Sequence, residues 1–208
     1  MRTRLRQKKE LLAVIETEQA AIRSGELVVL YIDQCHLNWG DVRGYSWGPS
    51  DKRITVSVVN ERERQTYYGA VNPLTGEITA ILADAGNGYW TQLFVGHLSQ
   101  HYNDKRLLIC WDGASYHRGQ EMQDYLEAVN FGRSPEEWAV KCLQFAPYAP
   151  EQNPIEEVWN QAKAFVRKNW YHCDETFASV KRLFEQALET LAFKFKKLSM
   201  YTQCLQTT

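Results

Sequence analysis

Apolar blocks along the chain predict a sheet whose central strands are buried on both faces. Leu27–Ile32 and Arg106–Trp111 are apolar almost throughout, and Val140–Phe145 is a third apolar segment. Short apolar runs of this kind are typical of central strands that are covered on both sides. We expect each of the three segments to form a strand, with Leu27–Ile32 in the centre of the sheet.

Other strand signals come early in the chain. Arg53–Asn60 is β-branched and alternates between apolar and polar residues, which predicts a half-buried strand. Thr66–Val71 and Glu77–Leu82 are separated by Asn72–Gly76, a segment with the residue types of a hairpin turn. The first part of the sheet is therefore expected to be antiparallel.

Helical periodicity fills most of the remaining chain. Helix formers with a loose apolar stripe predict a helix over residues 5–24, which Ser24 and Gly25 end. Antiparallel strands come first and strands alternating with helices follow, which predicts an α/β fold with a mixed sheet flanked by helices. The other predicted helices are Gly86–Tyr102, Gly119–Asn130, Asn153–Trp170 and a C-terminal one from Asp174 to about Phe195.

Size and composition indicate a globular protein. The chain has 208 residues, of which 44% are hydrophobic and 24% charged, enough for one full core with terminal elaborations. The apolar runs are too short to span a membrane, and the charged N-terminus has no apolar signal region. The five cysteines form no CxxC pair, so we expect free thiols in a reducing cytoplasm.

Charge is distributed unevenly along the chain. The net charge is only −1, but the first nine residues are basic without an acid, and bases outnumber acids from Val158 onward. The pattern fits ordinary solvated helix faces. It also fits a phosphate backbone held by basic flanks, if the acidic middle of the chain binds cations.

Two acids directly follow predicted buried strands. Asp33 follows Leu27–Ile32, and Asp112 follows Arg106–Trp111 and precedes small residues. Either could simply cap a turn at a strand end. Burying a carboxylate is costly unless it is paired or bound to a cation, however, and ligands gather at the carboxyl ends of strands. Both acids are therefore candidates for a cation site.

Glu156 is a third candidate, and it also has a purely structural explanation. Asn153 is a good N-cap, and Pro154 suits the first helical position. Glu156 then takes the third position, where a capping-box glutamate bonds back to the cap. The sequence alone leaves both roles open.

The helical wheel separates the two glutamates of this helix. A buried stripe is predicted, with Glu156, Asn160, Lys163 and Arg167 along one flank. Glu157 falls on the other flank, where we expect it to be solvated. An acid followed by amide and basic groups suits a metal and the phosphates bound to it. The stripe consists of Ile155, Val158, Trp159, Ala162, Phe165 and Val166.

Three motifs around these acids resemble a known family. They are YIDQCHLNWG around Asp33, ICWDGASYHRG around Asp112 and FAPYAPEQNPIEEVWNQAK around Glu156. At these residues, across roughly residues 27–170, the chain resembles the DDE transposases of the mariner superfamily, in particular the bacterial insertion-sequence branch. The resemblance implies a ribonuclease H-like fold with Asp33, Asp112 and Glu156 as catalytic triad and metal ligands.

The resemblance implies a metal-dependent DNA strand transferase. Carboxylates suit Mg²⁺ or Mn²⁺, and two ions are expected, bridged by Asp33, with Asp112 and Glu156 each holding one. Strand cleavage at transposon ends is expected first, then transfer into target DNA at a TA dinucleotide. The DNA contacts are assigned to His117, Asn160, Lys163 and Arg167.

The resemblance also sets expectations for organisation and partners. We divide the chain into a basic N-terminal helix and linker (1–26), the catalytic domain (27–172) and a C-terminal helical extension (173–208). The 26 leading residues are too few for the helix-turn-helix modules of the family, so a separate or frameshift-fused protein is expected to supply them. The partners are then transposon-end and target DNA and, for two ends, a second copy of the chain. The expected location is the bacterial cytoplasm, at the nucleoid when DNA is bound.

Two other functions use the same features. A structure-specific nuclease could share the ribonuclease H-like fold and the triad, although the proline-rich motif argues against it. An inactive DNA-binding or assembly subunit of a transposition complex would keep the fold without the chemistry, although the intact acids argue against that.

Overall fold

One mixed sheet organises the part of the chain that the computed structural model describes, namely residues 2–42, 49–52, 63–144, 153–170 and 176–193. Its strand order is β3-β2-β1-β4-β5. β1 pairs antiparallel with β2, as does β2 with β3, whereas β1–β4 and β4–β5 are parallel. The predicted order of antiparallel before parallel strands is therefore confirmed. The strands are β1 (Leu27–Asn38), β2 (Arg64–Val71), β3 (Ile78–Ala83), β4 (Arg106–Trp111) and β5 (Val140–Gln144).

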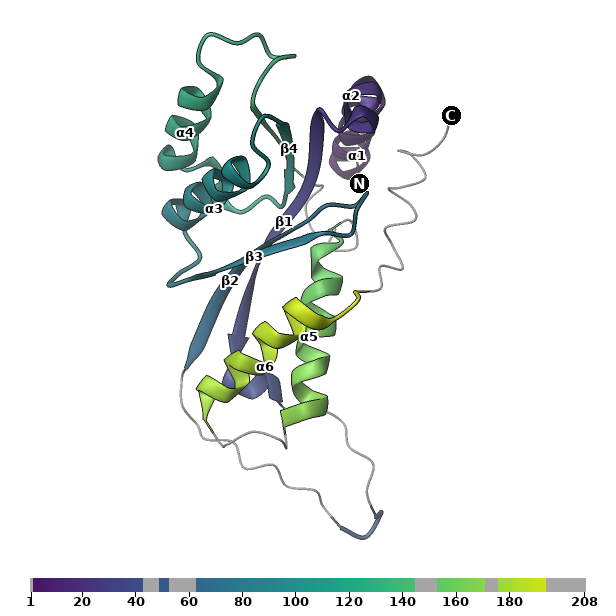
Figure 1. Cartoon of the computed structure of the whole chain (residues 1–208), viewed down its shortest axis with the longest axis vertical. Coiled ribbons are helices and arrows are strands. Elements are labelled where there is room, and N and C mark those ends of the chain that lie inside the picture. The colour runs from purple at the N-terminus through teal and green to yellow at the C-terminus, as the bar shows by residue number, and fades with distance from the viewer. Residues whose placement is uncertain (1, 43–48, 53–62, 145–152, 171–175, 194–208) are drawn as a thin grey trace.

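Helices cover both faces of this sheet. α3 and α4 lie on one side, and α1, α2, α5 and α6 on the other (Figure 1). Two 3-10 turns, η1 (Trp39–Val42) and η2 (Ser115–Arg118), follow β1 and β4. The helices are α1 (Arg2–Thr17), α2 (Gln19–Ser24), α3 (Gly88–His101), α4 (Gln120–Asn130), α5 (Ile155–Asn169) and α6 (Phe177–Thr190).

Alternation along the strands divides the core into two layers. In β1 the odd-numbered Val29, Tyr31 and Cys35 face α5 and α6, and the even-numbered Leu30 and Ile32 face α3. All five are buried. The segment is thus apolar throughout because both of its faces are covered, as the sequence predicts.

β1 continues beyond the apolar segment that predicts it. The strand runs on to Asn38, so Asp33 lies within it and not at its end, which corrects the sequence-based boundary. The reason is β2, which pairs with β1 from Tyr31 to Asn38. The predicted strand at Arg53–Asn60 lies outside the described residues.

The hairpin between β2 and β3 forms as predicted. The Asn72 side chain accepts hydrogen bonds from the backbone N–H groups of Leu74 (2.9 Å) and Thr75 (3.4 Å). Gly76 has a φ of 74°, a left-handed conformation that glycine adopts without strain. Residue chemistry alone is enough to specify this turn.

The terminal helices share the core of the sheet. The single helix predicted over residues 5–24 is two helices, broken at Glu18, and Gly25 ends the second with a φ of 72°. Buried Leu11 and Ile15 of α1 join the same apolar cluster as Phe177 and Phe184 of α6. Both ends of the described chain thus help to cover the face of the sheet that carries α5.

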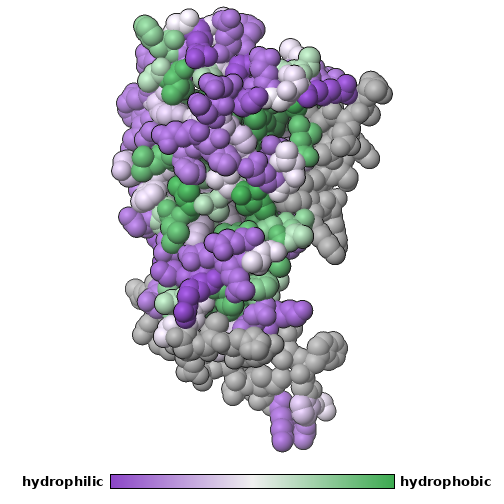
Figure 2. All heavy atoms as spheres, viewed as in Figure 1, coloured by the Kyte–Doolittle hydropathy of each residue, from purple (hydrophilic) through white to green (hydrophobic). Residues whose placement is uncertain are grey.

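The described surface is largely polar. Figure 2 shows hydrophilic side chains over most of the visible face, with small hydrophobic patches between them. No described helix is both long and apolar enough to cross a membrane.

Candidate active site

Asp33 and Asp112 leave neighbouring strands on the same face of the sheet. β1 and β4 run parallel, with Tyr31 opposite Cys110, and each acid comes two residues later. Because side chains alternate along a strand, both acids share the face of Tyr31 and Cys110, which is the face that α5 covers. The sheet register therefore places the two carboxylates side by side.

Glu156 reaches the same region from the first turn of α5. This helix packs against β1 and β2 through its predicted buried stripe, of which Phe165 alone is only partly buried. The buried Asn153 side chain, just before the helix, donates a hydrogen bond of 3.1 Å to the backbone carbonyl of Ile32. Asn153 thus ties the start of α5 to the residue that precedes Asp33.

The predicted capping box is wrong in its details. Pro154, not Asn153, takes the cap position, and no side chain caps this helix. Asn153 Oδ1 accepts a long bond of 3.4 Å from the N–H of Ile155, whereas the N–H of Glu156 donates to the Asn153 backbone carbonyl (3.2 Å). The reason is the bond to β1, which draws the Asn153 amide away from the helix.

The three acids interact electrostatically. Burial raises the pKa of Asp33 to about 7, and the negative charges of Glu156 and Asp112 add to the rise. The Gln34 backbone N–H opposes the rise, and so does the nearby Trp159 side chain. Asp33 is therefore a partly buried carboxyl group whose ionisation is opposed by its surroundings and by the charges of the two other acids.

Asp112 is held in the opposite electrostatic state. The hydrogen bond from His117 lowers its pKa most, against the effect of burial, and the N–H of Ala114 contributes (3.0 Å). The carboxylate is still 55% exposed. Asp112 is therefore ionised and open to solvent on one side, as a ligand for a cation should be.

His117 is buried beside Asp112 and does not lie on an open surface. Its Nδ1 lies 3.1 Å from both the backbone oxygen and Oδ1 of Asp112. The ring stacks on Trp111 with centroids 4.5 Å apart and planes 8° apart, and the residue is 5% exposed. This geometry suits orientation of the Asp112 carboxylate better than the predicted DNA contact.

The basic flank of α5 is partly engaged within the protein. Lys163 Nζ donates to the backbone carbonyl of His36 (2.8 Å) and pairs with Asp41 (3.1 Å). Asn160 is exposed and Arg167 is half-buried. Of the three predicted DNA contacts on this helix, Asn160 is the one whose side chain is plainly exposed.

Glu157 is not the solvated residue that the helical wheel predicts. It is half-buried, and its Oε2 is buried without a hydrogen-bond partner among the described residues. The Gln161 side chain donates to the backbone carbonyl of Glu157 (3.1 Å), not to its carboxylate. The helical wheel places the two glutamates on different flanks, but it does not predict that Glu157 is half-buried.

Trp159 is the neighbour of the acids that sequence reasoning overlooked. It is predicted only as part of the buried stripe, yet its side chain lowers the pKa of Asp33. An isolated glycine within a strand, such as Gly69 in β2, often marks a close approach by another group. A side chain at Gly69 would collide with Trp159, so the glycine was the available signal.

Comparison with protein families decides the classification. A family described as DDE superfamily endonuclease matches residues 28–178, a segment that holds all three acids. This chain belongs to the DDE superfamily endonucleases. A search of the curated proteins found no match for this family member.

Solved structures confirm the ribonuclease H-like fold of this DDE endonuclease. It is similar to the Mos1 mariner transposase in a paired-end complex with Mn, with a TM-score of 0.59 and 14% identity over 99% of this chain and 60% of that one. A Mos1 transposase paired-end complex with the left transposon end gives a TM-score of 0.56 and 14% identity over 96% of this chain and 60% of that one. A simian T-cell lymphotropic virus intasome in complex with PP2A regulatory subunit B56 gamma gives a TM-score of 0.54 and 13% identity over 87% of this chain and 55% of that one. The chain thus spans less than two thirds of each of these longer chains.

The acids of this DDE endonuclease fit a hard divalent cation. Within the described ranges, no group of three or more potential ligands is arranged to hold a metal ion as it stands. Mg²⁺ does not require such a cage, because it commonly binds one or two carboxylates together with substrate phosphates and water. Burial raises the pKa of Asp33 most, and a cation would neutralise the negative charges of Glu156 and Asp112 that add to the rise.

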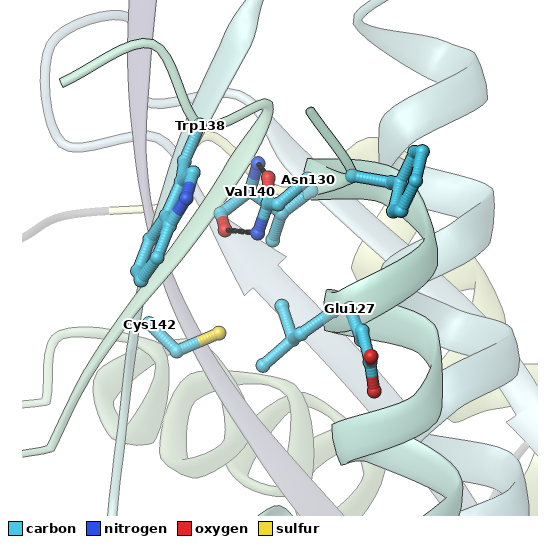
Figure 3. Close-up of a pocket in the computed structure, with 7 residues that line it drawn as sticks. Glu127, Asn130, Trp138, Val140 and Cys142 are labelled. Carbon is cyan, nitrogen blue, oxygen red and sulfur yellow. Dashed lines mark hydrogen bonds between the residues drawn. The ribbon is translucent and has the colours of Figure 1, made fainter. Parts of the chain in front are cut away.

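A separate pocket lies on the other face of the sheet of this endonuclease. It has a volume of about 430 Å³ and lies between α4 and β5, and Figure 3 shows Trp138, Cys142 and Glu127 around it. The Asn130 amide bonds both the N–H and the carbonyl of Val140 across it, at 3.2 and 2.9 Å. None of the predicted site residues lines this pocket, so it is distinct from the acid cluster.

Proposed function

We propose that this chain is the catalytic domain of a transposase that cuts DNA strands at the ends of a mobile element and joins them to target DNA. Membership of the DDE superfamily endonucleases supports the nuclease chemistry. The similar Mos1 protein is a transposase, solved with a transposon end and in a strand transfer complex. The proline-rich motif before Glu156 favours a transposase over a structure-specific nuclease.

The observation that carries the proposal is the electrostatic coupling of three acids from three elements. Asp33 of β1 feels the charges of Asp112 and Glu156, which come from β4 and α5. Like charges that converge on a buried carboxyl group destabilise the apoprotein, so their convergence needs a ligand to explain it. A cation that also binds phosphate is that ligand in our proposal.

The acids divide the work according to their surroundings. Asp33 is fixed in the middle of a paired strand and holds a proton near neutral pH until a cation replaces it. Asp112, kept ionised by His117, presents its exposed side to a cation, and Glu156 closes the site from α5. Bound Mg²⁺ or Mn²⁺ would polarise the scissile phosphate and activate the attacking water or 3′-hydroxyl.

The finer parts of the proposal concern DNA and partners. We propose that Asn160 and Arg167 contact the phosphate backbone beside Glu156, and that Lys163 positions α5 on β1 through its bond to the His36 carbonyl. The element is proposed to be a bacterial insertion sequence with a TA target. A second copy of the chain and a separate or frameshift-fused helix-turn-helix protein would complete the active complex.

A cleavage assay tests the proposal. The purified protein is incubated with Mn²⁺ and an end-labelled duplex that carries the terminal repeat flanking its own reading frame. We expect nicks at one fixed position with the parent protein and a loss of at least about 1,000-fold with Asp33→Asn, because the chemistry depends on the cation site.

Asp104→Asn is the matched control. Asp104 is exposed, lies before β4 at the end opposite to Asp112, and has a φ of 63° that asparagine also tolerates. This variant should nick like the parent. Retained nicking by Asp33→Asn refutes the site, random degradation of the duplex indicates a general nuclease, and binding without nicking indicates an inactive subunit.

A further inference from the structure

Trp159 is fixed in place one helical turn after Glu156. It is 4% exposed and stacks on Phe184 of α6 with centroids 6.1 Å apart and planes 22° apart. Phe184 in turn contacts the Tyr67 ring of β2 at 4.9 Å. Its burial and the stacking on Phe184 leave the indole little freedom to rotate.

The indole lies directly beside Asp33. A Cβ atom on Gly69 would come within 2.3 Å of Trp159 Cη2 and 2.5 Å of Cζ2, so the ring occupies the space above this glycine. Gly69 is the register partner of Asp33 in the β1–β2 pair. Residues directly opposite in an antiparallel pair have Cα atoms about 4.5–5.5 Å apart.

The indole N–H is a buried donor on a ring that lies over Gly69, the register partner of this acid. Trp159 Nε1 is buried and has no hydrogen bond of normal geometry to any described residue. Leaving a buried donor unsatisfied is costly, so such a group usually has a purpose.

We propose that Trp159 is a positioning residue whose indole N–H donates to one oxygen of the Asp33 carboxylate and thereby turns the other oxygen toward the bound cations. The inference rests on the proposed function of the acid cluster. The terminal torsion of an aspartate is broad, so a strand alone does not fix the direction of its oxygens. A donor on one oxygen does, and the carboxylate keeps acceptor capacity for the cation.

The direct test is an isosteric replacement. Site-specific incorporation of 3-(benzothiophen-3-yl)alanine at position 159 exchanges the N–H for sulfur and keeps the bicyclic shape. We expect the dissociation constant for Mn²⁺ to rise about 10-fold, as for other groups that orient metal ligands. The melting temperature of the metal-free protein should stay unchanged. A purely structural role of Trp159 would instead lower the melting temperature and leave Mn²⁺ affinity unchanged.

Trp39 offers a matched control within the same core. It is 3% exposed, belongs to the same apolar cluster, and its Nε1 is also buried without a partner in the described structure. It packs on Phe177 and does not influence Asp33. The same replacement at position 39 should leave Mn²⁺ affinity within about twofold, well below the tenfold effect expected at position 159.

A metal-free measurement separates the contact from the catalytic proposal. At pH 8 with EDTA, the indole proton resonance of Trp159 should move upfield in Asp33→Asn, and that of Trp39 should not. An unmoved Trp159 resonance overturns the inference, as does unchanged Mn²⁺ affinity in the position-159 analogue when the parent binds Mn²⁺. A moved resonance in a protein that cleaves no element-end DNA supports the contact and refutes the proposed function.

Discussion

Asp33 lies within a strand, where the metal-free folded protein disfavours ionisation of its carboxyl group. Buried Tyr31 and Cys35 flank it on the same face of β1, and Asp112 and Glu156 add negative potential. The folded protein therefore prefers the protonated carboxyl group, while the unfolded chain ionises near the ordinary value of 3.8. Selection of this residue for function must therefore oppose stability in the absence of metal.

This conflict predicts a pH-dependent gain in stability for Asp33→Asn. A raised folded-state pKa contributes stability that is complete below pH 3.8 and is lost as pH rises through about 7. The variant should match the parent near pH 4 and exceed it by on the order of 1–3 kcal/mol at pH 8. Urea unfolding in EDTA at both values measures the difference.

Asp104→Asn again provides the control, because its carboxylate is exposed. Its free energy of unfolding should stay within about 0.5 kcal/mol of the parent at both pH values. If Asp33→Asn were the less stable protein at pH 8, groups that stabilise the carboxylate would outweigh the burial and negative charges that oppose it, and the electrostatic account of the site would fail.

At the scale of elements, α5 owes its placement to one amide before its first turn. The Asn153 side chain links the carbonyl of Ile32 to the N–H of Ile155, so strand and helix share a contact next to two of the acids. A helix anchored in this way can present Glu156 at a fixed height over the sheet.

We predict that Asn153→Ala and Glu156→Gln fail in different ways. The first removes a buried hydrogen-bond partner and should cost about 1–3 kcal/mol of stability together with activity. The second keeps the size of the side chain and should lose Mn²⁺-dependent nicking with a stability change below about 1 kcal/mol. Urea unfolding and the nicking assay distinguish the two.

Asn169→Ala is the control at the other end of the helix. Within the described residues, the Asn169 amide bonds the Phe165 carbonyl of its own helix (2.8 Å), so its loss should leave nicking intact. Equal losses of stability in Asn153→Ala and Asn169→Ala would show that the link to β1 carries no special weight.

The elements were predictable from local pattern more than from contacts. Apolar runs located β1 and β4, and turn chemistry located the hairpin at Asn72, because both signals lie within a few residues. The end of β1 was missed, although Cys35 and Leu37 alternate with exposed His36 and Asn38. Sequence periodicity does not say which neighbour will pair with an alternating segment.

For the candidate site too, features encoded locally were predictable from the sequence, and features that depend on tertiary contacts were not. The acids were recognisable because carboxylates beside apolar runs are unusual. The bond from Asn153 to the Ile32 carbonyl, the burial of Glu157 and the effect of Trp159 on Asp33 were not recognisable, because each depends on elements that meet only in the folded sheet. Gly69 alone left a trace in the sequence.

At the scale of the whole molecule, two apolar layers on opposite faces hold the sheet. Cys35 and Cys110 are buried in the layer under α5 and α6, and burial raises the pKa of the Cys35 thiol to about 12. The pKa of Cys110 is raised further for the same reason. Neither thiol can react as a thiolate unless the layer opens.

Thiol labelling should therefore report the opening of this layer. With N-ethylmaleimide at pH 8, we expect Cys35 and Cys110 to react at the rate of global unfolding. Cys142, which is half-buried and lines the pocket beside α4, should react before them. Peptide mass mapping over time measures all three, and prompt modification of Cys110 in the native protein contradicts the expected protection.

The space over Gly69 has a consequence for how such sequences can diverge. Gly69 lacks a side chain where the Trp159 ring fills the volume. A relative with even a methyl group at position 69 must have a smaller side chain at position 159. A relative without the indole at position 159 has room for a side chain at position 69. The two positions lie in β2 and α5, ninety residues apart in the chain. They should therefore change together in an alignment of relatives, as a pair that records the shape of the site without containing any of its acids.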